Sequence, residues 1–160
     1  PEGKENSEHA SMKVFDLIGY AITATSPNEA LPNQFFLEKD KVVINRDRQL
    51  STAIDLLNTI EGGYEKPSQP KFNLGGSAVR DKMFEKLEAL YNENKILDHG
   101  LEVGKQIAFV LSGGNTNIDN ELSEDDLYNL ELEAFMRLIQ MPKTQERIKH
   151  TLETGKPLVN

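Results

Sequence analysis

The sequence predicts a mostly α protein: a helical bundle with two helical hairpins, an amino-terminal helical arm and at most one short strand pair. Apolar residues recur at three- and four-residue spacing over most of the chain, a pattern typical of amphipathic helices. The only short β-branched run, Lys41 to Ile44, is too short to found a sheet. We therefore expect roughly 60 to 65 % helix, with an arm and connector in residues 1–73 and the bundle in residues 74–160.

The composition indicates one domain of ordinary size with an acidic surface. A chain of 160 residues that is 38 % hydrophobic is long enough to bury a core. The formal net charge of -8 argues against nucleic-acid and anionic-membrane partners, because both require a positive field. The absence of cysteine excludes disulfides and zinc–thiolate sites within the chain and fits a cytoplasmic location. No apolar run approaches the roughly twenty residues of a membrane span.

The first residues predict a helical arm. The chain begins at Pro1 and its earliest methionine is Met12, so we expect it to start inside a larger gene product. Residues 1–5 are polar and are expected to be loose. A helix should follow over about residues 7–22, with Gly19 as a weak point but not its end. Its apolar stripe contains Ala10, Val14, Phe15, Leu17, Ile18, Ala21 and Ile22.

Two shorter helices are expected before the bundle. Ser26 and Glu29 form a capping box with Pro27 at the first helical position, and Pro32 keeps that helix short. Lys41 to Ile44 is the best candidate strand, and Asn45 should cap a helix over about residues 46–60 that Gly62 and Gly63 end. The residues that face inward from this helix should be Leu50, Ala53, Ile54 and Leu57. Residues 64–76 contain two prolines and predict an extended surface connector.

The bundle should consist of two helical hairpins. The first joins a helix from Ser77 to about Asn94 with a helix over about residues 101–111, which Gly113 and Gly114 end. Gly104 and Ala108 lie four residues apart and should permit close approach of a neighbouring helix. In the second hairpin, Ser123 caps a helix that ends near Gln140 or Met141. Pro142 then begins a second helix, which Gly155 closes. We expect a core that includes Phe84, Leu87, Ile107, Leu111, Leu130, Phe135 and Ile148.

No pattern in the chain identifies a catalytic, cofactor-binding or metal-binding residue. His9, His99 and His150 lack partners at metal spacing, so each is interpreted as a surface or helix-end residue. A calcium-loop template fits only in part, because Asn120 stands where glycine is needed and the last ligand is Asp; a linker with a cap is the better interpretation. The template positions are Asn115, Asn117, Asp119 and Asp126.

The remaining polar patterns also have structural interpretations. Gly75, Gly76 and Ser77 resemble a phosphate cradle before a helix, but a preceding strand and a lysine are missing, which favours a turn with a cap. Glu131 and Glu133 are two residues apart and point to different sides of a helix, so they do not form an acid–base pair. Solvated faces are expected at Glu65, Lys66, Glu85, Lys86 and Glu88.

The last forty residues carry the most specific pattern. They resemble the carboxyl-terminal end of long bacterial 3-hydroxyacyl-CoA dehydrogenases that also contain an enoyl-CoA hydratase (crotonase-like) region. The first helix matches that family's pattern at Ser123, Glu124, Leu127, Leu130, Glu131, Glu133, Ala134, Phe135 and Leu138. The second helix and tail match it at Pro142, Thr144, Arg147, Ile148, His150, Leu152, Thr154, Gly155, Lys156, Pro157, Leu158 and Asn160.

The resemblance implies a role within a larger enzyme of fatty-acid β-oxidation. The parent would bind NAD on a Rossmann domain and polarise an acyl thioester in its crotonase-like region, but neither motif occurs in these 160 residues. We therefore expect a non-catalytic, structural part without a cofactor of its own, whose partners are the upstream dehydrogenase and hydratase domains. Two alternatives stay open: a free-standing helical interaction module and, more weakly, a self-contained hydrolase or metal enzyme.

The amino-terminal stripe also raises the question of a homodimer. Val14, Phe15, Ile18 and Ile22 lie on one side of the arm, and the aromatic pair Phe35 and Phe36 follows. Such an apolar surface needs a cover. It would pack either on the bundle of the same chain or on the same arm of a second copy, with a slight preference for the symmetric dimer.

Overall fold

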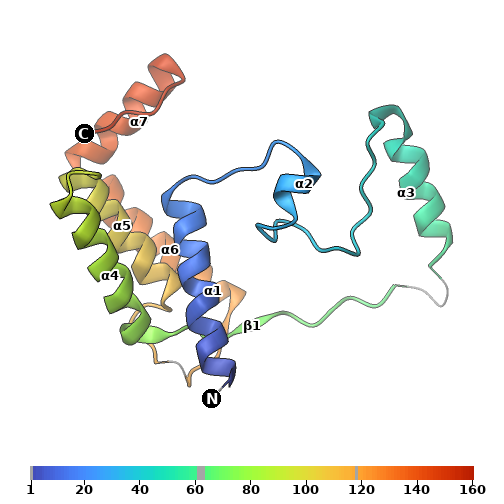
Figure 1. Ribbon diagram of the computed structural model, residues 1–160, viewed down its shortest axis with the longest axis horizontal. Helices are drawn as coiled ribbons and strands as arrows, with labels where there is room; N and C mark the ends of the chain where they lie inside the picture. The colour runs from blue at the N-terminus through green and yellow to red at the C-terminus, as the bar shows by residue number, and fades with distance from the viewer. Residues whose placement is uncertain (1, 61–63, 118) are drawn as a thin grey trace. The chain divides into compact units, whose positions relative to one another are not determined.

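The protein is mostly α, as predicted. The structure, a computed structural model, describes residues 2–60, 64–117 and 119–160. It is 60 % helical, and its described residues form seven α-helices and one two-stranded sheet (Figure 1). None of the helices in these ranges is both long enough and apolar enough to cross a membrane.

The chain divides into two compact units. One contains Pro1–Ile22 and Gln69–Asn160, and the other contains Thr23–Ser68. The sequence-based division between residues 73 and 74 does not coincide with this grouping. The physical reason is the arm, because its Phe15 side chain is buried in the same core as the helices of the bundle.

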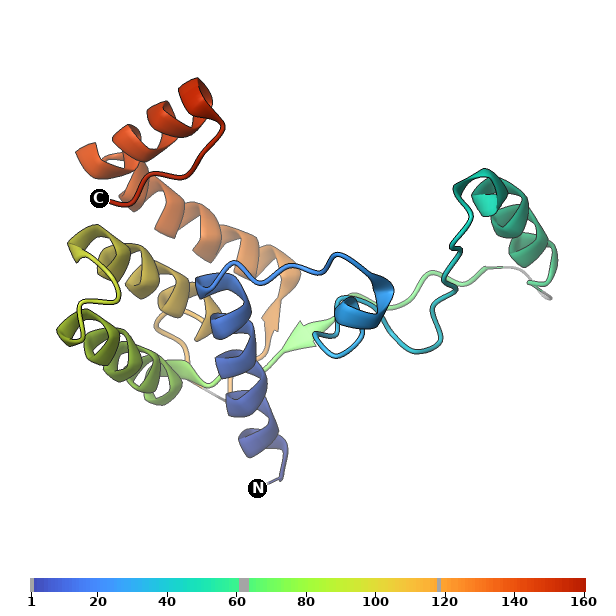
Figure 2. The same ribbon diagram turned by 45° about the horizontal axis from the view of Figure 1, so that its top comes forward.

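Three helices enclose the core of the first unit, and a fourth packs on one of them. Helix α1 (Glu2–Gly19) packs on α4 (Gly76–Asn92) and α5 (Asp98–Leu111), and α5 packs on α6 (Glu124–Ile139), as Figures 1 and 2 show. The buried residues at the centre are Phe15, Val79, Met83, Leu87 and Ala108. The predicted core residues Phe84, Ile107 and Leu111 are partly buried and pack against this cluster.

Helix α1 differs from its predicted bounds at both ends. It begins at Glu2 instead of near residue 7, in a stretch whose Glu and Lys residues favour helix. It ends at Gly19 instead of Ile22. The N–H of Ile22 donates to the carbonyl of Leu17 at 2.8 Å, and Ala21 adopts a left-handed φ of 50°. These are features of a Schellman ending, which usually places glycine where Ala21 stands.

The α4–α5 hairpin forms as expected. Its helices begin and end within a few residues of the predicted positions, and they lie side by side in Figure 2. A Cβ atom at Gly104 would lie 2.5 Å from Cδ2 of Leu87, so a side chain at this position would prevent the present packing. The predicted close approach at Gly104 is therefore confirmed.

The sheet is not where the sequence suggested. Strand β1 (Lys71–Phe72) pairs antiparallel with β2 (Leu122–Ser123), with Phe72 opposite Leu122. The prediction of a strand at Lys41 to Ile44 is wrong, because that run is irregular and Ile44 is almost fully exposed. A strand requires a neighbour for its backbone groups. Here the pairing joins the connector to the start of α6, and a Lys71–Glu121 ion pair of 3.1 Å flanks it.

The carboxyl-terminal helices confirm the predicted caps but not the predicted burial. Ser123 caps α6 in a reciprocal capping box with Asp126, and Gly155 ends α7 (Pro142–Thr154) with a left-handed φ of 68°. The expected burial of Phe135 and Ile148 is wrong. Phe135 is 52 % exposed, and α7 contains no buried residue. For α7 the reason is visible in Figure 1, since this helix continues beyond the ends of α4 and α5.

The unit Thr23–Ser68 contains α2 (Pro27–Ala30), the 3-10 helix η1 (Arg46–Arg48) and α3 (Gln49–Asn58). Ser26 and Asn45 cap helices as predicted, but the capping box at Ser26 is not completed, because the Glu29 carboxylate accepts from the N–H of Thr25 at 2.9 Å instead. The expectation that one side of α3 is covered is wrong, because every residue of α3 is at least partly exposed and Leu50 is 73 % exposed. The predicted stop at Gly62 and Gly63 lies outside the described residues.

Candidate binding cleft and exposed helix face

A cleft of the first unit lies among α1, α4 and α5. It has a volume of about 570 Å³. Most of its wall is apolar and comes from Phe15, Leu87, Leu90, Ile96, Val103 and Ile107. The polar side chains at this cleft are Asp16, Tyr20, Lys86, Lys95 and Arg147. The cleft therefore has the composition of a site for an apolar group with charged residues beside it.

The charged residues at the cleft already have partners. Lys86 forms an ion pair with Asp16, and Lys95 forms one with Glu93 at 2.6 Å. The hydrogen bond to Glu93 raises the pKa of Lys95, and the negative charge of Glu93 adds to this effect. Lys86 was predicted to lie on a solvated face, but it is half-buried because Asp16 of α1 holds it. Because they are paired, Lys86, Asp16 and Lys95 contribute to the packing of the cleft walls and do not offer an unpaired acid or base to a ligand.

Arg147 reaches the cleft from α7 and is held by the last residue of the chain. Its Nε donates to Oδ1 of Asn160 at 2.8 Å, and its Nη2 donates to the Asn160 carbonyl at 3.3 Å. Nδ2 of Asn160 donates to the carbonyl of Lys143 and to Oε2 of Glu146, each at 3.1 Å. The residues after Gly155 therefore turn back along α7. The contact that results joins Arg147 to Asn160, and both residues are positions of the family pattern.

His99 is the histidine whose burial the sequence did not predict. It lies near the start of α5, as a helix-end residue would, but it is buried. Its Nε2 and Oγ1 of Thr144 are hydrogen-bonded at 2.9 Å, which links α5 to α7. Burial lowers the pKa of His99, and the charges of Arg147 and Lys143 lower it further. A non-local partner of this kind leaves no signal in the local sequence.

The other histidines stand apart from one another. His9 is exposed and His150 is half-buried. Within residues 2–60, 64–117 and 119–160, no three His, Asp or Glu side chains gather closely enough to hold a metal ion.

The residues of the calcium-loop template serve as turn and cap residues. Oδ1 of Asn117 accepts the N–H of Asp119 at 2.9 Å, and Oδ1 of Asn115 accepts from Nη1 of Arg80 at 3.2 Å. The Asp126 carboxylate accepts from the backbone N–H and hydroxyl of Ser123, at 2.8 and 2.7 Å. The hydroxyl bond is the larger cause of a lowered pKa for Asp126. These contacts favour the linker-and-cap interpretation.

The glycines before α4 are packed against the protein itself. The N–H of Gly76 donates to the carbonyl of Ser112 at 2.9 Å. With its φ of 62°, a Cβ at Gly76 would lie 2.8 Å from the carbonyl oxygen of Thr116. Both Gly75 and Gly76 are buried, whereas Ser77 is exposed. This geometry favours a turn over a phosphate cradle, but the predicted cap at Ser77 does not form, because α4 begins at Gly76 and its N-cap residue is Gly75, which has no side chain to accept a hydrogen bond.

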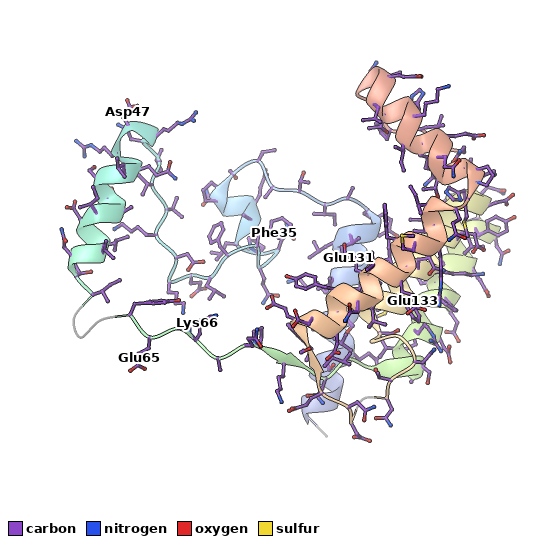
Figure 3. The ribbon with its side chains drawn as sticks, turned by 180° about the vertical axis from the view of Figure 1, so that it is seen from behind. Phe35, Asp47, Glu65, Lys66, Glu131 and Glu133 are labelled. Carbon is purple, nitrogen blue, oxygen red and sulfur yellow. The ribbon has the colours of Figure 1, made fainter. Side chains whose placement is uncertain are left out.

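The remaining charged residues behave as a solvated surface. Figure 3 shows Glu131 and Glu133 on different sides of α6, and Glu133 forms an ion pair with Arg137 of the next turn. Glu65 and Lys66, also labelled there, are exposed on the connector.

Helix α6 carries a second apolar face that the sequence analysis missed. Its side chains are exposed and belong to Tyr128, Leu132, Phe135 and Met136. Beyond the end of this face, Ile139 of α6 and Ile148 and Leu152 of α7 line a notch of about 360 Å³. The signal was present in the sequence, because apolar residues fall on two sides of α6, with Leu130 and Ala134 on one side and Leu132 and Phe135 on the other.

A second groove lies at the junction of α1, β1, α5 and α6. It has a volume of about 550 Å³ and an apolar lining that includes Val14, Phe72, Leu74, Val110 and Leu127. The Ser7 hydroxyl donates to the carbonyl of Asn73 beside it, which fastens the start of α1 to the end of β1.

Comparison with known proteins gives a relative over almost the whole chain. The chain is 30 % identical over 153 residues to the probable 3-hydroxyacyl-CoA dehydrogenase of Bacillus subtilis (strain 168). The match covers 95 % of this chain and 19 % of that protein, in its carboxyl-terminal part, so the chain spans about a fifth of the relative's length. No family model and no solved structure matches the chain. The resemblance to the carboxyl-terminal part of a 3-hydroxyacyl-CoA dehydrogenase is thus confirmed.

Proposed function

We propose that this chain is the carboxyl-terminal, non-catalytic part of a 3-hydroxyacyl-CoA dehydrogenase and enoyl-CoA hydratase that acts in fatty-acid β-oxidation. Its role there is structural: it packs against the upstream domains of the same parent chain. The observation that carries this proposal is the match of nearly the whole chain to the carboxyl-terminal part of a relative named as a dehydrogenase. Four fifths of that relative has no counterpart in these residues.

The uses of the polar groups support a non-catalytic role. Asp126 caps α6, Glu133 pairs with Arg137, and His99 bonds to Thr144 across two helices. A catalytic acid or base must instead face a substrate within hydrogen-bond reach. These groups stabilise helices and helix contacts.

The residues present do not fit a dinucleotide site. Such a site needs a glycine turn between a buried strand and a helix, with free N–H groups for the pyrophosphate. Strand β1 has two residues, and the N–H of Gly76 is used by the Ser112 carbonyl. We therefore place NAD binding in the upstream part of the parent.

A free-standing helical interaction module is the second candidate. The exposed apolar face of α6 favours it, because such faces mark protein contacts. The two candidates differ in what the gene encodes. The first requires an open reading frame that continues far upstream of Pro1, and the second requires one that encodes little beyond these residues.

Activity measurements test the proposal. The parent should oxidise 3-hydroxyacyl-CoA with NAD, whereas the purified 160-residue chain should not. In the parent, Glu131→Gln and His150→Gln should leave kcat within about twofold, since neither side chain reaches reacting atoms. Turnover by the isolated chain that a substitution within residues 1–160 abolishes would overturn the non-catalytic assignment.

A further inference from the structure

The exposed side of α6 has the spacing of a contact surface. Tyr128, Leu132, Phe135 and Ile139 follow one another at intervals of four, three and four residues, so they lie on one side of the helix. Met136 lies at the edge of this row. We call these five residues the outer α6 stripe. An apolar stripe of this length, more than two turns long, is unusual on a surface that only water touches.

The chain's own core does not need the outer α6 stripe. The opposite side of α6 contacts α5 and the turn that follows it: Ala134 is buried, and Leu130 packs so closely on this turn that a Cβ at Gly114 would lie 2.6 Å from its Cδ2. At 100° per residue, the stripe lies roughly 160° around the helix from Leu130 and Ala134. Helix α6 is therefore held in place without any help from Phe135 or Leu132.

The charges around the stripe indicate the chemistry of its cover. Glu124, Asp125 and Glu131 are exposed and lie beside the stripe. The one basic residue of α6, Arg137, is turned to the inner side, where it stacks 4.9 Å from the centre of the Phe109 ring. A second copy docked on the same face would bring acidic residues against acidic residues. A surface flanked by Lys or Arg would be complementary instead.

From the exposed apolar stripe and the acidic residues beside it, we propose that the outer α6 stripe docks on an upstream segment of the same parent polypeptide. This segment presents an apolar face flanked by Lys or Arg. The inference rests on the proposed function, which supplies the additional chain: the match covers only 19 % of the relative. The stripe continues into the notch between Ile139, Ile148 and Leu152, which offers a place for one large apolar side chain of the segment. Lys149 and Glu153 also line this notch, but they pair with each other at 3.9 Å and add no net charge.

Thiol labelling of the full-length parent tests the docking. These 160 residues contain no cysteine, so each introduced thiol reports on one position of this part of the parent. The variants are Phe135→Cys and Leu132→Cys on the stripe, with Glu88→Cys on the exposed side of α4 as the control. Maleimide labelling is followed by peptide mass spectrometry in the native parent and in the denatured parent. Mass spectrometry separates these peptides from any native cysteine upstream.

The proposal predicts selective protection. Native labelling at the two stripe positions should be slower than in the denatured parent by at least about a hundredfold, and at the control position by less than about tenfold. Equal labelling rates at Phe135→Cys and Glu88→Cys in the native parent would overturn the proposal. The Leu132→Cys variant keeps the test decisive if Phe135→Cys fails to fold, as judged by circular dichroism.

A thiol-to-amine cross-linker identifies the partner. In a mixture of isotopically light and heavy parent carrying Phe135→Cys, the proposal expects links within one chain to an upstream lysine. Links between light and heavy chains would overturn it in favour of a second copy, and protection without any link would remove lysine from the flank. Dehydrogenase turnover is measured in the same samples. An active parent with an unprotected stripe contradicts the docking alone, whereas turnover by the isolated chain contradicts the proposed function.

Discussion

The Arg147 guanidinium and the Asn160 side-chain oxygen are joined by a hydrogen bond of 2.8 Å between α7 and the last residue of the chain. Asn160 also donates to Lys143 and Glu146, so one amide side chain connects three residues of α7. Both Arg147 and Asn160 belong to the pattern that carries the family resemblance. Their contact gives a physical reason for that pairing: it orders the tail and orients Arg147 at the cleft.

Asn160→Ala should therefore release the tail without unfolding the bundle. Each lost hydrogen bond is worth about 1 kcal/mol, and only residues 156–160 depend on these bonds. Nitrogen-15 relaxation should show lower order parameters at Leu158 and Val159, with the thermal midpoint lowered by no more than several degrees. Val159→Ala is the control, because that side chain is largely exposed. A rigid tail in Asn160→Ala would show that the tail does not depend on these bonds.

The close approach of α5 to α4 gives a matched pair of glycine substitutions. Gly104→Ala should lower the free energy of unfolding by about 1 to 3 kcal/mol, because its Cβ would lie within 2.5 to 3.3 Å of the buried Leu87 side chain. Gly100→Ala on the same helix meets only Cβ of Ile96, at 3.5 Å, and should stabilise by about 0.5 kcal/mol. Urea denaturation measures both. Equal effects at the two positions would contradict the packing described for Gly104.

His99 should make the stability fall in mildly acidic solution. Its pKa is lowered in the folded protein, mainly by burial, so the unfolded chain binds a proton more readily. Stability is then unaffected by this group above its unfolded pKa of about 6.5 and decreases as the pH falls below that value. The decrease stops only below the folded pKa.

Thermal midpoints between pH 8 and pH 5 test this dependence, with His99→Gln as the variant that cannot titrate. The difference between the wild-type and variant curves should appear below about pH 6.5. A variant with the same slope as the wild type would assign the acid sensitivity to other groups.

Two methionines should respond very differently to truncation. Met83 is fully buried in the core, and Met83→Ala should cost about 2 to 5 kcal/mol because it leaves a cavity. Met136 belongs to the outer α6 stripe, and Met136→Ala in the 160-residue chain should change the stability by less than about 0.5 kcal/mol. Chemical denaturation of both variants measures the difference. A large loss at Met136 would mean that this chain covers the stripe itself.

Local signals in the sequence predicted local structure well. Ser26, Ser123, Pro142 and Gly155 were each placed correctly at a helix end, because a cap depends on residues within one turn. Ala21 shows the limit of this reasoning. It takes the left-handed position that ends α1 although its residue type gives no indication of that conformation.

Contacts between distant segments could not be predicted in this way. Periodicity shows that α6 has apolar residues, but it does not show which side α5 covers, and Phe135 was assigned to the wrong side for that reason. The bond between His99 and Thr144 and the pairing of Phe72 with Leu122 join residues 45 and 50 positions apart. The candidate cleft depends on such contacts as well, since its walls come from one helix that precedes residues 23–68 in the sequence and from helices that follow them.

The docking of α1 on α4 and α5 has a consequence for the order of folding. The ion pair of Asp16 with Lys86 spans 70 positions, whereas α4, α5 and α6 follow one another with short connections. Closing the long loop costs entropy before any contact of α1 compensates for it. We expect a transition state in which the α4–α5 hairpin is formed and α1 is still detached. Phe15→Leu should then accelerate unfolding and leave the refolding rate nearly unchanged, whereas Leu87→Ala should slow refolding. Stopped-flow chevron plots measure both rates. An equal decrease of the refolding rate in the two variants would refute this order.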